Sequence, residues 1–143
     1  MGPIRALGAT DYEALLELWL VSGLDSLRPQ GRDGREAFVR QLERGQAVFG
    51  IEEEGRLIAA VAATDDTRKG WINRLVVHPD HRRRGHGLRL VRAAEESLRR
   101  RGLTIICALI EDYNDASLAL FESAGYRADR HVIYVSRRDT PES

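Results

Sequence analysis

The most informative part of the sequence runs from Trp71 to Leu90 and reads WINRLVVHPDHRRRGHGLRL. It holds an apolar strand, then a loop rich in arginine and glycine, then a helix that starts at about Gly87. Pro79 ends the strand because proline has no N–H to give to a sheet. The first amides of a helix have no partner within it, and the helix dipole adds partial positive charge there. The stretch therefore predicts a site for an anion at the start of this helix.

The residues of the loop point to a diphosphate or a similar polyanion. Gly85 and Gly87 let the backbone turn sharply and approach a ligand closely, and the arginines at 82–84 add charge and two-pronged phosphate geometry. A plain connection with solvated arginines, or a nucleic-acid patch, would explain the charge but not two glycines at a helix start. A nucleic-acid patch would also be wider and interleaved with aromatic residues. The loop completes neither a P-loop nor a G-x-G-x-x-G dinucleotide motif.

Outward from this stretch, hydrophobic periodicity predicts strands and helices in the order βααβββαβαββ. The expected strands are Pro3–Leu7, Ala47–Glu52, Leu57–Ala63, Trp71–Val77, Thr104–Ile110, Tyr126–Ala128 and His131–Val135. The expected helices begin near Asp11, at a cap formed by Asp33 with Glu36, near Gly87, and at a cap formed by Asn114 or Asp115. The last two end at Gly102 and Gly125. This order predicts an α/β fold of three layers, in which helices cover both faces of a mixed sheet of about seven strands.

Length and composition limit the class of protein. The 143 residues are about one domain long, so residues 1–143 are expected to form a single domain with a polar, frayed tail at 137–143. Basic and acidic residues number 22 each, which leaves no net field to attract nucleic acid or a membrane surface. The sequence opens on no signal peptide and contains no run of ~18 apolar residues, so a cytoplasmic location is expected. The single cysteine, Cys107, is interpreted as a buried small hydrophobe in preference to a nucleophile.

Two sequence motifs, taken together, carry a family resemblance. Arg82-x-x-Gly85-x-Gly87 follows a strand that ends in Leu-Val-Val-x-Pro, and Asn114 opens the run NDASLALFESAGY. At this separation they resemble the acetyl-CoA signature and the N-x-x-A/S…L-Y-x-x-x-G-F/Y stretch of the GNAT superfamily of N-acetyltransferases, especially its small stand-alone bacterial members. The order of elements matches along nearly the whole chain. The resemblance implies an enzyme that moves the acetyl group of acetyl-CoA to a primary amine by direct attack in a ternary complex.

The resemblance also implies which residues hold acetyl-CoA. In the family, the fourth and fifth strands splay apart and the coenzyme lies in the gap like an extra strand. Backbone groups of residues 75–77 would hold the pantetheine arm and thioester carbonyl, amides of residues 83–88 would cradle the pyrophosphate, and Asn114 would hydrogen-bond the arm. The full expected set is Leu75, Val76, Val77, Arg82, Arg83, Arg84, Gly85, His86, Gly87, Leu88 and Asn114. No metal ion is expected.

The catalytic groups depart from the family pattern. The tyrosine that usually serves as acid is Phe121 here, and the glutamate base of some relatives is Leu109. Glu111, at the mouth of the fifth strand, is the candidate base, directly or through water; a solvated carboxylate without a role is the other interpretation. The candidate replacement acids are Tyr113, Tyr126 and Tyr134. We expect a working transferase with little acid assistance, because such assistance contributes ~10²–10⁴-fold and a thiol of pKa ~8.5 is a tolerable leaving group.

Several residues border the site with open roles. Only one of Asn73 and Arg74 is expected to face the acceptor, because side chains alternate along a strand. His78 and His81 are expected at the surface, as accessory phosphate contacts or without a role. By family analogy the acceptor pocket is bordered by Trp19, Leu24 and the loop that carries Arg28, Arg32 and Arg35. These arginines would favour an acidic acceptor or be merely solvated.

Alternatives to amine acetylation stay open. Phe121 and Leu109 would also suit a non-catalytic acyl-CoA sensor. The loop recognises CoA and not the acyl group, so another acyl chain or an alcohol acceptor is compatible with it. The sequence does not specify the acceptor, a small-molecule or peptide amine. The terminal strands could pair edge to edge and give a homodimer, whereas nucleic-acid and membrane partners are not expected.

Overall fold

The structure is a computed structural model that describes residues 2–143. Within these residues, one five-stranded sheet has the order β1-β2-β3-β4-β5, with β1 to β4 antiparallel and β5 parallel to β4. The strands are β1 (Ile4–Ala6), β2 (Ala47–Glu53), β3 (Arg56–Asp65), β4 (Gly70–Val77) and β5 (Ile106–Ala108). The helices are α1 (Tyr12–Val21), α2 (Arg35–Glu43), α3 (His86–Arg100) and α4 (Asp115–Ser123), with short 3-10 turns η1 (Ala9–Asp11) and η2 (Pro79–His81). The α/β class and the first nine elements of the predicted order are confirmed.

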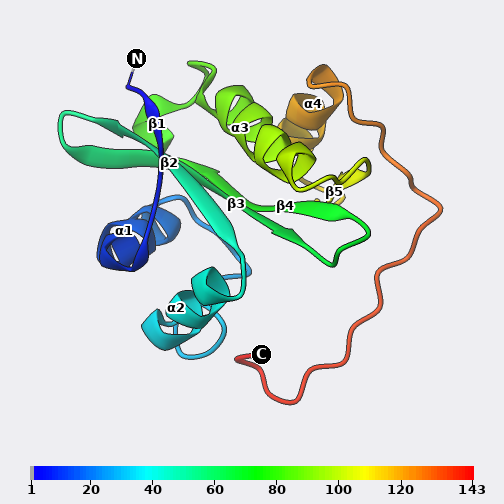
Figure 1. Ribbon diagram of the computed structural model, residues 1–143, viewed down its shortest axis with the longest axis horizontal. Helices are drawn as coiled ribbons and strands as arrows, with labels where there is room; N and C mark the ends of the chain where they lie inside the picture. The colour runs from blue at the N-terminus through cyan, green and yellow to red at the C-terminus, as the bar shows by residue number, and fades with distance from the viewer. Residues whose placement is uncertain (1) are drawn as a thin grey trace.

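Helices cover the sheet on both faces, α1 and α2 on one and α3 and α4 on the other (Figure 1). Each face has its own buried cluster of apolar side chains, and the sheet separates the two clusters. Strand β3 lies between them, and its residues 57–63 are buried without interruption. This double burial explains why β3 reads as a continuous apolar run and not as an alternating one.

Helix α3 is held to the sheet by a regular apolar stripe. Leu90, Val91, Ala94 and Leu98 recur at helical spacing and are all fully buried. On the solvent-facing side of the helix, Glu95 and Arg99 form an i,i+4 ion pair. Such a pair stabilises a helix by only a few tenths of a kcal/mol. Burial of each large apolar side chain contributes about 1.5–3 kcal/mol, so the stripe stabilises the helix far more than its surface charges do.

Strands β4 and β5 pair only where they begin. Residues 70–72 of β4 face residues 106–108 of β5, and beyond these pairs the two strands part. A β-bulge follows directly in β4, since Ala60 faces Val76 while Ala62 faces Asn73. Two residues of β4, Arg74 and Leu75, therefore oppose one residue of β3, and Arg74 takes a left-handed backbone with φ of 54°. Among the described residues, no strand pairs with this edge of β4 beyond residue 72.

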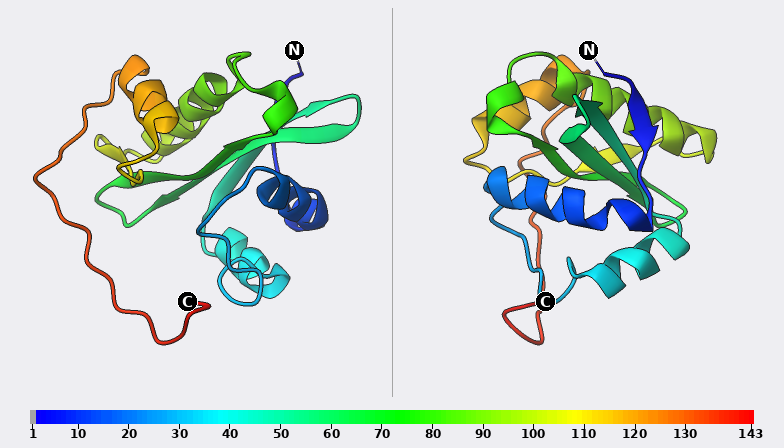
Figure 2. Two further views of the ribbon diagram at one scale, coloured as in Figure 1. Left: turned by 180° about the vertical axis from the view of Figure 1, so that it is seen from behind. Right: turned by 90° about the vertical axis from the view of Figure 1, so that its left-hand side faces the viewer.

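The two strands expected at the C-terminal end, Tyr126–Ala128 and His131–Val135, are wrong, as is the total of about seven. Residues 127–143 run as an extended connection outside the two helical layers and return to the α1–α2 loop (Figures 1 and 2). Arg28 Nε donates to the carbonyl of Pro141 at 3.1 Å, and an Arg32 nitrogen donates to that of Ser143 at 2.9 Å. Strand β5 is only three residues long, so its outer edge is too short to pair with further strands.

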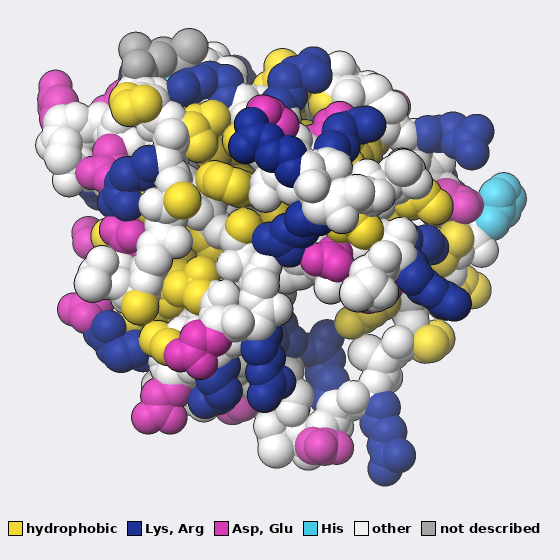
Figure 3. All heavy atoms as spheres, in the orientation of Figure 1, with side chains coloured by type: hydrophobic (Ala, Val, Ile, Leu, Met, Phe, Trp, Pro, Cys, Tyr) yellow, Lys and Arg dark blue, Asp and Glu magenta, His cyan; other side chains and the backbone are white. Residues whose placement is uncertain are grey.

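Surface charge is mixed over the face drawn in Figure 3, where basic and acidic side chains lie among one another. That pattern agrees with the equal totals of 22 acidic and 22 basic residues. Among residues 2–143, no helix has the length and apolar character needed to cross a membrane.

Candidate active site

The start of α3 presents free backbone amides. Gly85 precedes the helix with φ of +82°, a left-handed conformation that favours glycine, and no atom lies near the place of a Cβ. In the described part of the chain, the N–H groups of Gly85, His86, Gly87 and Leu88 donate to no acceptor. These are the amides that a helix leaves unpaired, and they lie where the helix dipole is positive. The geometry suits an anion.

The three arginines of the loop are placed differently from one another. Arg82 Nε donates to the carbonyl of Val77 at 3.1 Å, and its Nη2 donates to that of Ser22 at 3.3 Å, so this side chain ties the end of β4 to the end of α1. The side chains of Arg83 and Arg84 are exposed. Arg83 has φ of 63°, which costs a non-glycine residue about 1–3 kcal/mol and is commonest at ligand-binding turns.

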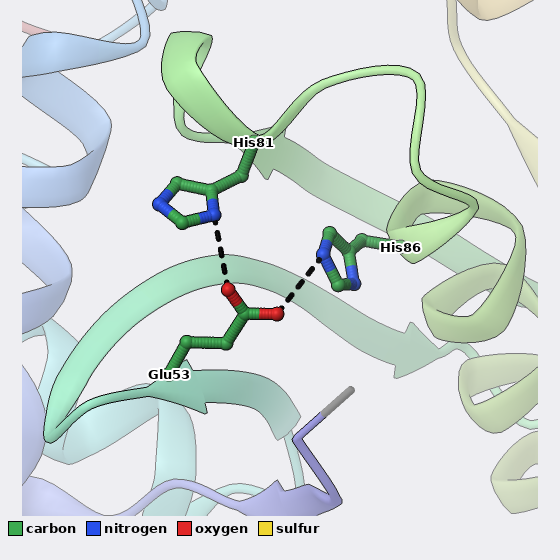
Figure 4. A group of neighbouring side chains, drawn as sticks. All are labelled: Glu53, His81 and His86. Carbon is green, nitrogen blue, oxygen red and sulfur yellow. Dashed lines mark ion pairs between the residues drawn. The ribbon is translucent and has the colours of Figure 1, made fainter.

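The histidines beside the loop are more buried than expected. His78 is buried; its Nδ1 accepts from the N–H of Asp80 at 3.1 Å, and its Nε2 lies 3.0 Å from Arg56. The side chain of His86 is fully buried and points beneath the loop, so only its backbone N–H can meet a ligand above (Figure 4). Burial lowers the pKa of His86, because a charged imidazole loses its hydration there.

A cleft of about 390 Å³ opens where β4 and β5 part. Several predicted site residues line it, namely Trp19, Leu24, Arg32, Leu75, Leu109, Glu111, Asn114 and Phe121. The loop at 82–88 does not line the cleft. It follows the C-terminal end of β4, whereas β4 pairs with β5 at its N-terminal end. Trp19 is buried, and its indole N–H has no hydrogen-bond partner among residues 2–143. Because buried donors are nearly always paired, this N–H is a candidate contact for a ligand in the cleft.

Arg74 and Asp33 form a buried ion pair in the wall of the cleft. Both carboxylate oxygens of Asp33 accept from one Arg74 nitrogen, at 3.0 and 2.9 Å, and Asp33 also accepts from the N–H of Arg28. Asp33 was expected to cap α2, but Gly34 is the N-cap residue. Asn73 and Arg74 both line the cleft, so the expectation that only one faces it is wrong; the bulge breaks the alternation. The ion pair between Arg74 and Asp33 joins residues 41 positions apart, and no local sequence pattern predicts it.

The candidate catalytic residues lie at different depths. Glu111 and Leu109 are exposed at the rim, whereas Phe121 is buried and packs edge-on against Tyr126 with ring centres 5.2 Å apart. The hydroxyl of Tyr126 donates to Glu95 of α3 at 3.1 Å, and burial raises the pKa of Tyr126 well above its usual value. The hydroxyl of Tyr113 donates to Asp25 at 3.1 Å, which also raises its pKa.

Asn114 caps α4 with its side chain, as expected. Its Oδ1 accepts from the N–H of Ser117 at 3.1 Å, and its side-chain NH₂ group donates to nothing in the described chain. Asn114 lines the cleft from the α4 side.

The arginines of the α1–α2 loop contact groups of this chain. Arg28 and Arg32 donate to backbone carbonyls of the C-terminal segment and of their own loop. Arg35 pairs with Glu13 and lies over the ring of Tyr12, 5.0 Å from its centre. These three arginines therefore form contacts that hold the loop and the C-terminal segment in place.

Comparisons with known proteins agree on a family. Residues 12–126 match the model of the Acetyltransferase (GNAT) family. An acetyltransferase of Sodalis glossinidius is 29% identical over 136 residues, which cover 94% of each chain. A putative acetyltransferase from Agrobacterium tumefaciens has a similar structure, with a TM-score of 0.79, 24% identity, and coverage of 94% of this chain and 99% of that one. The PaiA N-acetyltransferase of Thermoplasma acidophilum, solved with coenzyme A, has a TM-score of 0.79 at 18% identity, covering 90% of this chain and 91% of that one.

Proposed function

The chain belongs to the Acetyltransferase (GNAT) family, and from this premise we propose that it moves the acetyl group of acetyl-CoA to a primary amine by direct attack in a ternary complex. The observation that carries the proposal is the row of amides from Gly85 to Leu88, which follows the free edge of β4; in residues 2–143 neither the amides nor this edge has a backbone partner. A diphosphate and an amide-bearing arm would satisfy these two sets of groups together.

The coenzyme would lie along β4 from the cleft to the loop. The amides of residues 85–88 would bind the pyrophosphate, with the exposed Arg83 and Arg84 adding charge. The free edge of residues 75–77 would pair with the pantetheine arm as a strand would, and the side-chain NH₂ of Asn114 would donate to the arm from the other side. Arg82 would act indirectly, by fixing the end of β4.

Bound acetyl-CoA supplies an activated thioester. Backbone N–H groups near Val76 and Val77 would stabilise the oxyanion that forms when a neutral amine attacks the carbonyl carbon. The C–N bond forms, the C–S bond breaks, and the amine proton would pass to water or to Glu111 at the rim. The thiolate would leave without an acid, because Phe121 carries no proton to give and Tyr126 is engaged by Glu95. Positioning of the two reactants would supply most of the acceleration.

Binding of acetyl-CoA is tested by thermal unfolding of the protein with and without it. At 100 times its Kd the ligand adds ~2.7 kcal/mol to the stability of the folded state. No stabilisation at millimolar acetyl-CoA would contradict the proposal. Release of free CoA thiol against a panel of amines, peptides and polyamines then separates a transferase from a sensor module, which would bind without turnover. Family membership does not favour the sensor. The same assay with a panel of alcohols tests for an alcohol acceptor, and the assay with longer acyl-CoA substrates tests for another acyl chain.

A substitution at Gly87 tests the loop itself. Gly87→Glu places a negative charge among the free amides and lowers acetyl-CoA affinity by about 100-fold or more, because like charges repel strongly at such distances. Gly87→Ala is the control: within the described chain its Cβ would meet only the two methyl groups of Leu120, at 2.9 and 3.9 Å, which form the flexible end of a side chain. Isothermal titration measures both affinities. Unchanged affinity in Gly87→Glu would show that the coenzyme binds elsewhere.

A further inference from the structure

We propose that Glu53, His81 and His86 form a binding site for a divalent transition metal ion, with zinc the best fit. Glu53 is the last residue of β2, His81 ends η2, and His86 is the first residue of α3 (Figure 4). The three side chains converge from separate elements beneath the loop at 82–85. The site is distinct from the cleft and does not depend on the proposed acetyl transfer.

The distances match those of a metal centre. His81 Nδ1 lies 3.2 Å from Glu53 Oε2, and His86 Nε2 lies 3.6 Å from Glu53 Oε1. One ligand atom from each residue lies within 4.8 Å of the others. Two donors held ~2.0–2.1 Å from one tetrahedral zinc ion are about 3.4 Å apart, which agrees with the two separations between an imidazole nitrogen and a carboxylate oxygen of Glu53. An ion can therefore enter with small movements of side chains.

The imidazole nitrogens lack the hydrogen bonds that would explain their burial. In the described chain, neither ring nitrogen of His86 has a hydrogen-bond partner, and Nδ1 of His81 has none either. Both rings face the Glu53 carboxylate, yet neither contact has hydrogen-bond geometry. Buried polar atoms without partners are rare and call for an explanation. A cation between the rings and the carboxylate would satisfy both nitrogens that face Glu53.

The donor set selects the class of ion. Two imidazoles and one carboxylate, with a fourth position for water, are a common ligand set of zinc. Calcium and magnesium prefer oxygen ligands and would bind such a set poorly. His78 does not belong to the site, since its two nitrogens already contact Asp80 and Arg56.

Bound metal would join the end of β2 to both ends of the loop. His81 and His86 flank residues 82–85, so one ion would fix the turn that contains the left-handed Arg83 and Gly85. The expected effect is higher thermal stability in the presence of the ion, by mass action.

The test uses the full chain without a histidine tag, stripped with a chelator and then titrated with zinc. We expect one ion per chain by calorimetry, a higher Tm with zinc but not with magnesium, and the strong visible absorption of tetrahedral cobalt when Co²⁺ is used instead. Absence of stoichiometric zinc binding at sub-millimolar zinc would overturn the proposal.

Matched variants locate the site. Glu53→Gln and His81→Gln keep the size of half-buried side chains and should weaken zinc binding by at least about tenfold. His131→Gln is the control, since His131 is exposed in the C-terminal segment. Circular dichroism establishes that each variant is folded. Equal zinc affinity in wild type, Glu53→Gln and His81→Gln would place the ion elsewhere and overturn the proposal.

Discussion

Helices α3 and α4 lie on the same face of the sheet, and each begins at a candidate coenzyme contact, but they are held very differently (Figure 1). Helix α3 buries five residues, His86 among them, and four apolar ones form its stripe. Within the described chain, α4 buries a single residue, Phe121. The proposed phosphate end of the site is thus built on a well-packed helix, whereas the proposed acceptor end depends on a lightly packed one.

The same contrast extends to the rest of the cleft. The proposed acceptor side is bordered by the α1–α2 loop and the tip of β5, which are held by polar contacts such as the one between Arg74 and Asp33 and by partly buried apolar side chains such as Leu24. Segments with few buried apolar contacts open locally at low cost in free energy. If the proposed sites are correct, coenzyme binding and acceptor binding can change separately, because they depend on parts of the fold with unequal local stability.

The largest expected effect comes from the stripe of α3. Leu98→Ala should lower the free energy of unfolding by about 3 kcal/mol, because Leu98 is fully buried and leaves a cavity. Leu118→Ala on the half-exposed side of α4 should cost less than about 1 kcal/mol. Urea unfolding of both variants measures the difference. Equal losses would break the contrast between the two helices.

A second substitution tests the ion pair between Arg74 and Asp33, which joins β4 to the α1–α2 loop in the wall of the cleft. Asp33→Asn should lower the free energy of unfolding by about 2 kcal/mol, since it leaves the charge of Arg74 half-buried without its partner. Glu36→Gln is the control, being an exposed carboxylate at the start of α2. Chemical unfolding gives both values. If Asp33→Asn were as stable as Glu36→Gln, the loop would be held by something other than this pair.

The smallest effect is expected in the C-terminal segment. The side chains of residues 132–135 are exposed, Ile133 to 82%, so Ile133→Ser should change stability by less than about 0.5 kcal/mol. Thermal unfolding at several protein concentrations is the measurement. A loss above 1 kcal/mol that grows with protein concentration would show that a second copy covers this segment.

Sequence predicted best what depends on neighbouring residues. The loop at 82–88, the stripe of α3 and the cap at Asn114 each follow from a short local pattern, and the structure contains the turn, the helix and the cap. The run from His131 to Val135 has the alternation of a strand but lacks a partner edge, which no local pattern reveals. Glu53 and His86, or Asp33 and Arg74, meet only through the fold, so sequence could not bring them together.

The bulge in β4 has a consequence for what the chain can tolerate. Ile72 packs in the cluster under α3, whereas Val76, four residues later, packs in the cluster under α1. In an unbroken strand both would point the same way. The additional residue at 74 shifts the alternation of side chains by one position, so Ile72 and Val76 face opposite sides of the sheet. Removing that residue would restore the regular alternation and leave Val76 opposite Ala60 in the same cluster, because a single residue of β4 would then face Val61. What would be lost is the left-handed backbone at 74 and the side chain that pairs with Asp33, so the bulge is needed for this ion pair and not for the placement of Val76.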